Sequence, residues 1–578
     1  MTLIDDYLDE SEKYRQKYGD NTAVLMQVGH FYEAYAVDNA TERPNADNLY
    51  RLSDIMNIQM TRKNKSNVEN SRGNPLMIGV NIYSIDKFVQ ILLNNFYTIV
   101  IIDQTSQPPY VKREVTNIYS PGTNIKFSSV GETNNLVAIY IEEIENKQKF
   151  QNNFCCGISA VDLATGKNVV YETFSRVDDQ SFALDELFKF IQVYDPKELV
   201  LIKKNVHLSD SKLFSYLHLT DRIVHVKDVD AGDCDTQFFN LNYQTTFLGR
   251  VFKNRGLLSP IEYIGLEYMP FALNSYIFLL QFAYEHSEQI IQNLGAPDIW
   301  QLDRHLSLTN NTINQLNLVA NPSLNCKTKF NSLFAVINNT STTIGKRYLR
   351  DRLLNPIVNT EALQQRYDMI EALDGVVFAE NDSSQTSIYK YLETYLNKII
   401  DLERAHRKMT LGLLHPADLT GLCGSYENII EIFDFIKTLN SEAIKRLIPD
   451  SQLLDKFMAL IDEVKHDFDL EQCVKYHQDK ITGNIFNPGV FPEIDEVCDK
   501  IAECFSNFDS LNKTLSIKLE GVEDAILKLD HNERDGYFLT TTQKRGAAIK
   551  SAIKSSSNFV VNGINIKNDL DFKNPTKS

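Results

Sequence analysis

The sequence lacks any cysteine spacing that would indicate a metal site or a disulfide framework. Its eight cysteines are scattered over 578 residues and none forms a C-x-x-C pair. Zinc sites and disulfide-stapled folds both need closely and regularly spaced cysteines. We therefore predict reduced, buried thiols, which are typical of an intracellular protein.

Secretion and membrane signals are also missing. The first twenty residues are acidic and polar, without the apolar core of a signal peptide. The most apolar helical stretch, residues 270–291, is interrupted by Asn274, Ser275, Gln281 and Glu285. It is too polar for a membrane span, so we predict a core helix. The expected protein is intracellular and non-secreted, with no membrane partner.

A net positive charge is missing as well, since the formal net charge is -17. This argues against a general nucleic-acid binder. Two segments are nevertheless basic. Residues 61–72 hold Arg62, Lys63, Lys65 and Arg72 against Glu69, and the stretch from Thr542 on holds Lys544, Arg545, Lys550, Lys554, Lys567, Lys573 and Lys577 against Asp569 and Asp571. Local basic patches can contact phosphate despite an acidic body. Charge pattern alone favours the alternative that both are solvated loops.

No catalytic motif is present. A phosphate loop needs G-x-x-x-x-G-K-[ST], in which backbone amides and a lysine surround phosphate. In TSTTIGKR, residues 340–347, Thr340 replaces the first glycine and Arg347 the hydroxyl residue; in VDLATGKN, Val161 and Asn168 fail the same tests. Because H-E-x-x-H and G-x-S-x-G are also absent, the residues give no support for a stand-alone hydrolase.

The chain does contain enough material for several domains. At ~150 residues per domain the length predicts about four. Mixed strand and helix patterns fill residues 1–125 and again 130–250. Helical periodicity dominates residues 265–490, and a β-containing piece follows at 491–578. The predicted fold class is multidomain α/β plus α: two small mixed α/β domains, a long helical section and a short β-containing end.

Within the first domain we predict strands at 24–28, 75–80 and 98–103. The helix beginning at Ile85 is expected to use Ser84 as its N-cap. After residue 265, strand-like patterns return only at 536–542 and 558–566.

The stretch VLMQVGHFYEAYA, residues 24–36, places Phe31, Tyr32, Glu33 and Tyr35 just after Gly29, at the expected end of a strand. Core packing is one interpretation and is favoured for a single such motif. The other is a wedge, in which an exposed aromatic stacks on a base and a carboxylate accepts a hydrogen bond from the base edge.

Several segments, taken in order, resemble the MutS family of DNA mismatch-recognition proteins. GHFYEAY is similar to the family's G-D-F-Y-E-L-F, and residues 75–108 resemble its P-M-A-G-[VI]-P-Y-H…C-E-Q stretch. REVTNIYSPGTNI, GISAVDLATGKNVVYE, TTIGKRYLRDRLLNPI and DLERAHRKM resemble later family segments in the same order. His30 and Arg352 stand where the family usually has Asp and Trp, so the chain is identified as a divergent member. Its F-Y-E form resembles that of the bacterial-like members, which include organellar and viral relatives.

The resemblance implies a domain order and a mechanism. Residues 1–125 would be the mismatch-recognition domain, 130–250 the connector, 265–490 the helical lever and core, and 491–578 a clamp-like domain. Phe31 would wedge beside a mispaired or unpaired base and Glu33 would accept a hydrogen bond from it. The predicted DNA-contacting residues are Phe31, Glu33, Arg62, Lys63, Lys65, Lys544, Arg545, Lys550 and Lys554.

The resemblance also implies partners and cofactors. The partners would be mismatched double-stranded DNA and a second copy or a MutL-like repair protein, bound through the connector. The family's ATPase domain has no counterpart in this sequence, so we expect ATP and magnesium only in that part and no enzyme activity here. A fragment, a split gene and a truncated copy all fit. The alternative function is a truncated, non-enzymatic scaffold that no longer grips DNA.

Overall fold

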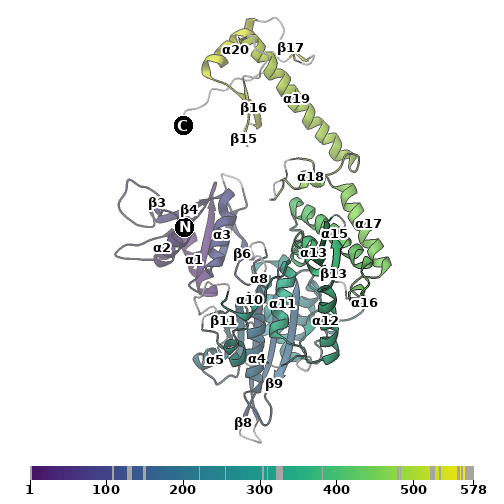
Figure 1. The fold of residues 1–578 in the computed structure, drawn as a ribbon. Coiled ribbons are helices and arrows are strands. Elements are labelled where there is room, and N and C mark those ends of the chain that lie inside the picture. Colours follow the sequence, from purple (N-terminus) through teal and green to yellow (C-terminus); the bar gives the residue numbers. More distant parts are fainter. Residues whose placement is uncertain are drawn as a thin grey trace. The chain divides into compact units, whose positions relative to one another are not determined.

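The computed structural model describes most of the chain (Figure 1). The described residues are 3–106, 110–125, 133–146, 151–220, 222–253, 255–301, 305–306, 308, 310–320, 330–379, 382–477, 481, 483–520, 527–532, 536–555, 560–561 and 564–565. They divide into two compact units. Unit 1 is Met1–Leu414 with Gly421–Asp450, and unit 2 is His415–Thr420 with Ser451–Ser578.

Unit 1 begins with a six-stranded sheet, here called the first sheet, in the order β3-β4-β2-β1-β5-β6. Its elements are α1 (Leu3–Tyr18), β1 (Thr22–Val28), β2 (Phe31–Ala36), α2 (Ala46–Met56), β3 (Thr61–Arg62), β4 (Leu76–Asn81), α3 (Ile85–Asn94), β5 (Thr98–Gln104) and β6 (Arg113–Tyr119). Strands β1 and β5 pair in parallel, with α3 directly before β5 in the chain, and β1 and β2 form an antiparallel hairpin. The central strands are buried on both faces, which explains their unbroken apolar runs.

Ser84 differs from its expected role. It occupies the position before α3, but its side chain makes no capping hydrogen bond. A short 3-10 turn, Ile82–Ser84, precedes the helix, and Asn81 caps that turn by accepting from the Tyr83 backbone N–H at 3.0 Å. The chain therefore enters α3 through a tightened turn, and the capping side chain belongs to that turn.

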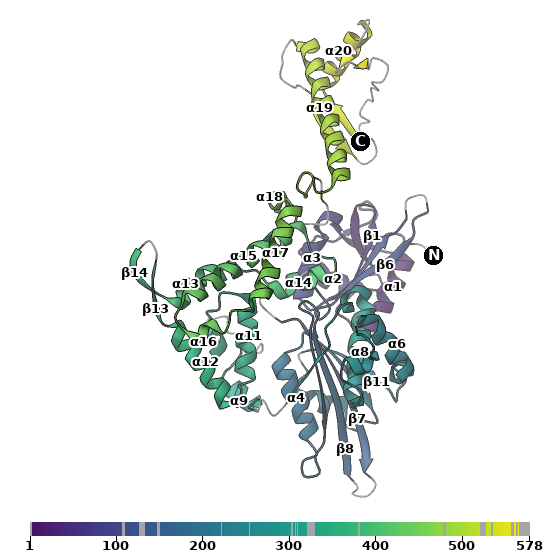
Figure 2. The ribbon, with the colours of Figure 1, turned by 90° about the vertical axis from the view of Figure 1, so that its right-hand side faces the viewer.

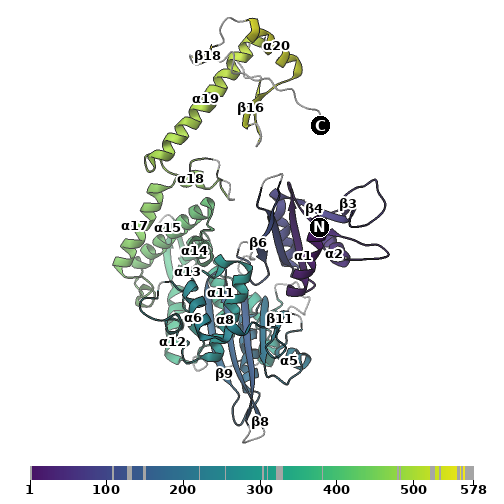
Figure 3. The same ribbon diagram turned by 180° about the vertical axis from the view of Figure 1, so that it is seen from behind.

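The second sheet of unit 1 has the order β11-β10-β7-β8-β9-β12. Its elements are β7 (Asn135–Asn146), β8 (Gln151–Asp162), β9 (Lys167–Phe174), α4 (Phe182–Tyr194), β10 (Glu198–Lys204), α5 (Asp210–Leu217), β11 (Ile223–Asp228), α6 (Leu241–Val251), α7 (Pro260–Tyr263), α8 (Pro270–His286) and β12 (Asp298–Ile299). Helices α4 and α5 share one apolar cluster with alternate residues of β7 and β8, whereas α8 packs on the other residues of these strands. Figure 2 shows the strands between α4 and α8, and Figure 3 shows α6 and α8 in front of them.

Gly157 on β8 allows α8 to lie directly on the second sheet. A Cβ atom at this position would overlap the backbone carbonyl of Phe271, which cannot move aside as a flexible side chain could. We expect Gly157→Ala to lower the free energy of unfolding by about 3 kcal/mol, the upper end of ordinary overpacking. Urea unfolding measures this. Gly424→Ala is the control, because nothing lies within 4 Å of its Cβ position. Equal stabilities of the two variants would contradict the close approach.

The rest of unit 1 is mainly helical. Its elements are α9 (Asn310–Gln315), α10 (Leu333–Ile337), α11 (Thr343–Leu354), α12 (Thr360–Leu373), β13 (Val376–Ala379), β14 (Asp382–Ser387), α13 (Ile388–Leu396), α14 (Leu402–Thr410), the later part of α15 (Pro416–Thr438) and α16 (Glu442–Lys445). The antiparallel hairpin of β13 and β14 corrects the prediction that strands return only near the end. The predicted fold class, mixed sheets followed by a helical region, is confirmed.

Unit 2 contains α17 (Ser451–Asp467), α18 (Leu470–Cys473), α19 (Pro492–Glu520), β15 (Lys528–Asn532), β16 (Gly536–Thr540), α20 (Gln543–Ser555), β17 (Val560–Val561) and β18 (Ile564–Asn565). Helix α20 packs Ile549 and Ile553 against Leu515 of α19 and Leu527. The solvated-loop interpretation of the basic run after Thr542 is therefore wrong for residues 543–555. Lys567, Lys573 and Lys577 lie outside the described residues.

No helix in the part of the chain that the structure describes combines the length and the apolar character that a membrane-spanning segment requires.

Candidate nucleic-acid interface

The aromatic stretch lies on a strand of its own, which corrects its expected position at a strand end. Strand β1 ends at Val28, the chain turns at Gly29 and His30, and β2 begins at Phe31, opposite Val28. Gly29 has a φ of 61°, a conformation that glycine adopts without the Cβ penalty of other residues. The turn therefore fixes Phe31 at the first position of a paired strand.

Side chains along β2 alternate between the two faces of the first sheet. Phe31 is 46% exposed, whereas Tyr32 and Tyr35 are buried. Phe31, Glu33 and Tyr35 share one face because side chains two residues apart in a strand point the same way. Helix α1 covers the Tyr35 end of this face, where the Tyr7 and Tyr35 rings meet edge to face at 5.3 Å. Core packing thus explains Tyr35 but does not account for Phe31.

Tyr35 holds the carboxylate of Glu33. Its hydroxyl donates to Oε2 of Glu33. Burial, together with this hydrogen bond, raises the pKa of Tyr35, so the phenol remains a donor at neutral pH. Oε1 of Glu33 accepts no hydrogen bond within the described part of the chain. One oxygen of Glu33 is therefore oriented by the core, and the other is left for an external donor.

Tyr32 serves the opposite face of the sheet. Its hydroxyl donates to Oδ1 of Asp103 at 2.6 Å, and Thr116 donates to Oδ2 of the same carboxylate at 2.6 Å. For Tyr32 the core interpretation is correct.

Arg113 is a cation at the Phe31 end of the sheet that the sequence analysis did not single out. Its Nε donates to the Gln27 carbonyl at 3.0 Å. Gln27 Oε1 accepts from the Gln104 N–H at 2.9 Å, and its amide donates to the Gly29 carbonyl at 3.2 Å. The strand register places Arg113 on the face of Glu33. Only the pairing of β5 with β6 brings it there, although its place in REVTNIYSPGT was a signal.

The basic segment 61–72 lies at the other end of the first sheet. Arg62 pairs with Leu76, which lies opposite Ala36, whereas Phe31 lies opposite Asn81. Five residues of strand separate these positions, roughly 17 Å. Lys63 and Lys65 are exposed. The structure therefore does not bring Arg62, Lys63 and Lys65 together with the aromatic end.

Arg72 of the same segment is held by acids of the domain itself. Its guanidinium pairs with Asp5 at 2.9 Å and with Glu42 at 3.0 Å. This arginine therefore braces the segment against α1.

The second basic group lies on α20 in unit 2. Lys544 and Lys550 are exposed and Arg545 is half-buried. Ile549 and Ile553 face α19, so the lysines lie on the remaining helix surface. Lys554 lies in the last turn of α20, and its side chain is outside the described residues.

TTIGKR forms the first turn of α11, and a side chain of the same segment caps this helix. The Thr342 hydroxyl accepts from the Gly345 N–H at 3.0 Å, which caps α11. Arg347 is buried and makes two hydrogen bonds to Asp401, at 2.6 and 2.7 Å, and one to Glu403 at 2.6 Å. The two sequence segments TTIGKR and DLER therefore bind each other, and the helix start does not resemble a phosphate loop.

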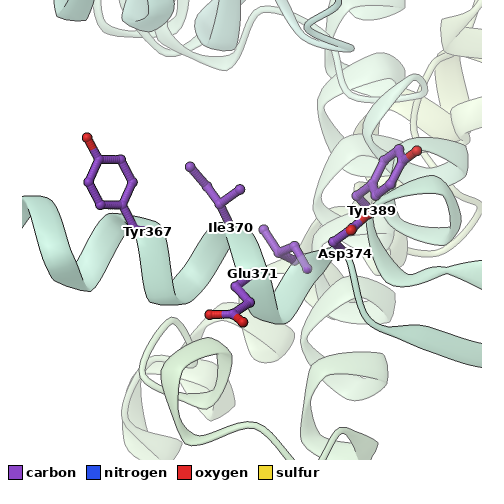
Figure 4. Close-up of a pocket in the computed structure, with 6 residues that line it drawn as sticks. Tyr367, Ile370, Glu371, Asp374 and Tyr389 are labelled. Carbon is purple, nitrogen blue, oxygen red and sulfur yellow. The ribbon is translucent and has the colours of Figure 1, made fainter.

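A pocket of about 610 Å³ lies along α12 and the start of α13 (Figure 4). Its lining is apolar and acidic: Tyr367, Ile370, Glu371, Leu373, Asp374 and Tyr389. Figure 4 shows Tyr367, Ile370 and Glu371 projecting from α12. Over the described ranges no group of three or more His, Cys, Asp and Glu residues could hold a metal ion.

Comparison with known proteins agrees with this architecture. The family model of MutS domain I matches residues 12–128, and that of MutS domain III matches residues 311–532. The first covers the sheet that carries Phe31, and the second covers the helical region and part of unit 2. The chain is thus a multidomain protein that contains domains of the MutS I and MutS III types.

Individual relatives give the same result. A DNA mismatch repair MutS homologue of Acanthamoeba polyphaga mimivirus is 32% identical over 99% of this chain and 52% of its own length. MutS of Lachnoclostridium phytofermentans is 24% identical over 80% of this chain and 44% of its own, and that of Caldanaerobacter subterraneus is 24% identical over 94% and 55%. The chain belongs to the MutS family. It spans about half the length of these curated relatives.

Proposed function

We propose that this chain binds duplex DNA and recognises mispaired or unpaired bases, with Phe31 as the wedge and Glu33 as the base-contacting acceptor. The observation that carries the proposal is the pairing of an exposed Phe31 with a Glu33 carboxylate that Tyr35 orients on the same face. Aromatic side chains inserted from the minor groove partly unstack a base step and kink the duplex. A mispaired step costs less to unstack than a matched step, so it is selected.

Glu33 would add selectivity rather than affinity. A carboxylate is repelled by the phosphates, and only a base N–H positioned at its available oxygen offsets that repulsion. The direct test is binding of the full chain to duplexes that differ by one mispair, followed by fluorescence anisotropy. Equal affinity for matched and mispaired duplexes would contradict the proposal.

Sequence-independent affinity would come from the basic residues of α20. The logarithm of the binding constant falls linearly with the logarithm of the salt concentration, and each lysine–phosphate contact that is lost makes this slope less steep by about 0.9. We expect Lys544→Gln with Lys550→Gln to make this slope less steep by about 2 and to weaken matched and mispaired duplexes equally. Lys500→Gln is the control, because Lys500 lies outside the basic run of α20, on α19, and pairs with Glu496 at 2.6 Å. An unchanged salt dependence in the double variant would show that Lys544 and Lys550 of α20 do not contact phosphate.

We also propose that this chain by itself does not hydrolyse ATP. The sequence contains no G-x-x-x-x-G-K-[ST], and Arg347, where a hydroxyl would hold magnesium, is committed to Asp401 and Glu403. We expect the purified chain to release no phosphate from ATP with magnesium present, in a phosphate-release assay. Turnover that disappears in Lys346→Ala would overturn this.

Family membership also supports a second copy of the chain, or a MutL-like repair protein, as a partner of the second sheet. Light scattering of the purified chain tests the first, and binding to a purified MutL-type protein tests the second. The scaffold alternative predicts such protein binding without any duplex binding.

A further inference from the structure

Glu198, the first residue of β10, is a fully buried carboxylate whose partners come from two domains. From the second sheet, His225 Nε2 on β11 lies 2.7 Å from Oε1. From the segment that follows β6, the Gly122 N–H donates to Oε2 at 3.0 Å and the Ser120 hydroxyl donates to the same oxygen. Ser120 and Gly122 belong to the region that matches MutS domain I.

The fit around Gly122 is close. A Cβ atom there would lie 2.9 Å from Cβ of Glu198 and 3.2 Å from Cδ1 of Leu136. A hydrogen bond within the segment closes a turn, because the Thr123 N–H donates to the Ser120 carbonyl at 3.2 Å. The turn Ser120–Thr123 therefore presents both donors to Glu198 as a preformed unit.

Two further contacts join the same domains beside Glu198. Lys17 at the end of α1 pairs with Glu285 of α8 at 2.7 Å. The Tyr18 ring lies 5.1 Å from the His286 ring, which in turn packs on Phe282. Glu198 thus sits inside a joint formed by α1, the segment after β6, α8 and the edge of the second sheet.

Glu198 is held as an anion in this joint. Burial opposes its ionisation, but the hydrogen bond and electrostatic interaction with His225, together with His286 and the Ser120 hydrogen bond, outweigh burial and lower the pKa of Glu198. A buried charge that loses part of its hydrogen-bonding shell is strongly disfavoured. Because domain I supplies two of the three donors, moving the domain away would leave the anion under-satisfied. One arrangement of domain I on the second sheet is therefore favoured over a range of orientations.

We propose that Glu198 is a positioning residue, which fixes domain I on the second sheet so that Phe31 is presented in one orientation. This inference rests on the proposed function. A wedge must enter one base step at one angle, so a loosened joint would spread the orientations of Phe31 and weaken discrimination more than non-specific binding.

The experiment compares Glu198→Gln with Glu172→Gln in the full chain. Glu172 is the matched control, because its carboxylate caps α8 by accepting from the Phe271 and Ala272 N–H groups at 2.7 and 3.1 Å, without donors from domain I. Ser120→Ala is the milder second variant if Glu198→Gln folds poorly. Hydrogen exchange of residues 113–125 reports the joint, and the ratio of mispaired to matched affinity reports discrimination.

We expect about tenfold faster exchange of residues 113–125 and a lower affinity ratio in Glu198→Gln, and neither change in Glu172→Gln. If hydrogen exchange of residues 113–125 is unchanged in Glu198→Gln, or is accelerated equally in both variants, Glu198 does not hold the two domains together. Faster exchange with an unchanged ratio would overturn the positioning role. If the wild-type chain does not discriminate, the proposed function fails instead, and exchange alone still decides whether the joint exists.

Discussion

Replacement of Phe31 by alanine is expected to abolish the preference for a mispaired duplex while weak binding to matched duplex persists. Stacking of an aromatic ring on a base contributes about 1–3 kcal/mol. At 1.4 kcal/mol per factor of ten, this corresponds to roughly fivefold to 140-fold in the affinity ratio. Phosphate contacts elsewhere do not depend on the ring, so matched binding should change little. Fluorescence anisotropy with a matched and a mispaired duplex, at one salt concentration, measures the matched affinity and the affinity ratio.

Phe174→Ala is the matched control for this experiment. Phe174 is also 46% exposed, but it lies on β9 and packs edge to face on Phe271 at 5.7 Å. Its replacement should leave the preference intact. A preference that survives in Phe31→Ala would remove Phe31 from the wedge role, whereas its loss in both variants would indicate a general effect on folding.

Arg347→Met is expected to lower the free energy of unfolding by about 3–5 kcal/mol at pH 7, the usual effect of breaking a buried ion pair. The variant removes the buried guanidinium that the half-buried carboxylates of Asp401 and Glu403 share. Arg350→Met on the same helix is the control. Arg350 lies 3.3 Å from Asp195, which keeps its 2.9 Å contact with Arg222, so a much smaller loss is expected. Urea unfolding of both variants measures the difference.

The stability difference between wild type and Arg347→Met should depend on pH. Burial alone would raise the pKa of Asp401 and Glu403, but Arg347, with Lys167 at Glu403, lowers both. A carboxyl with a lowered pKa in the folded state stabilises the fold above its unfolded pKa, here 3.8 and 4.5. This contribution is lost as pH falls through the folded values. The difference should therefore be full above about pH 5 and smaller in acid. A constant difference from pH 7 to 4 would contradict the role of the two carboxylates.

Much of the fold could be predicted from the sequence. The β-branched run 98–103 appears as β5, and the helical spacing from Ile85 appears as α3. Such patterns are local, since a strand buried on both faces needs an unbroken apolar run and an amphipathic helix needs a 3.6-residue period. The order of the family-like segments likewise identified the family, because co-linearity survives divergence of single positions such as His30.

Other features could not be predicted because they depend on distant contacts. Helix α20 was missed, since its apolar face consists mainly of Ile549 and Ile553 and only packing on α19 reveals it. In the hairpin of β13 and β14, β13 is only four residues long and β14 is polar throughout, so neither strand shows a period-two pattern. The separation of Arg62 from Phe31 follows from the pairing of β4 with both β2 and β3, which no local pattern encodes.

For the candidate site, the sequence by itself determined which residue types are available and that Phe31 and Glu33 lie two positions apart. On a strand that spacing places both side chains on one face. Tertiary structure alone decided that Phe31 is exposed while Tyr35 is covered by α1, that Tyr35 orients Glu33, and which groups Arg113 and Glu198 contact. Burial and hydrogen bonding between residues 71 to 86 positions apart, or between domains, arise only when the strands have paired, because sequence patterns report neighbours along the chain and not neighbours in space.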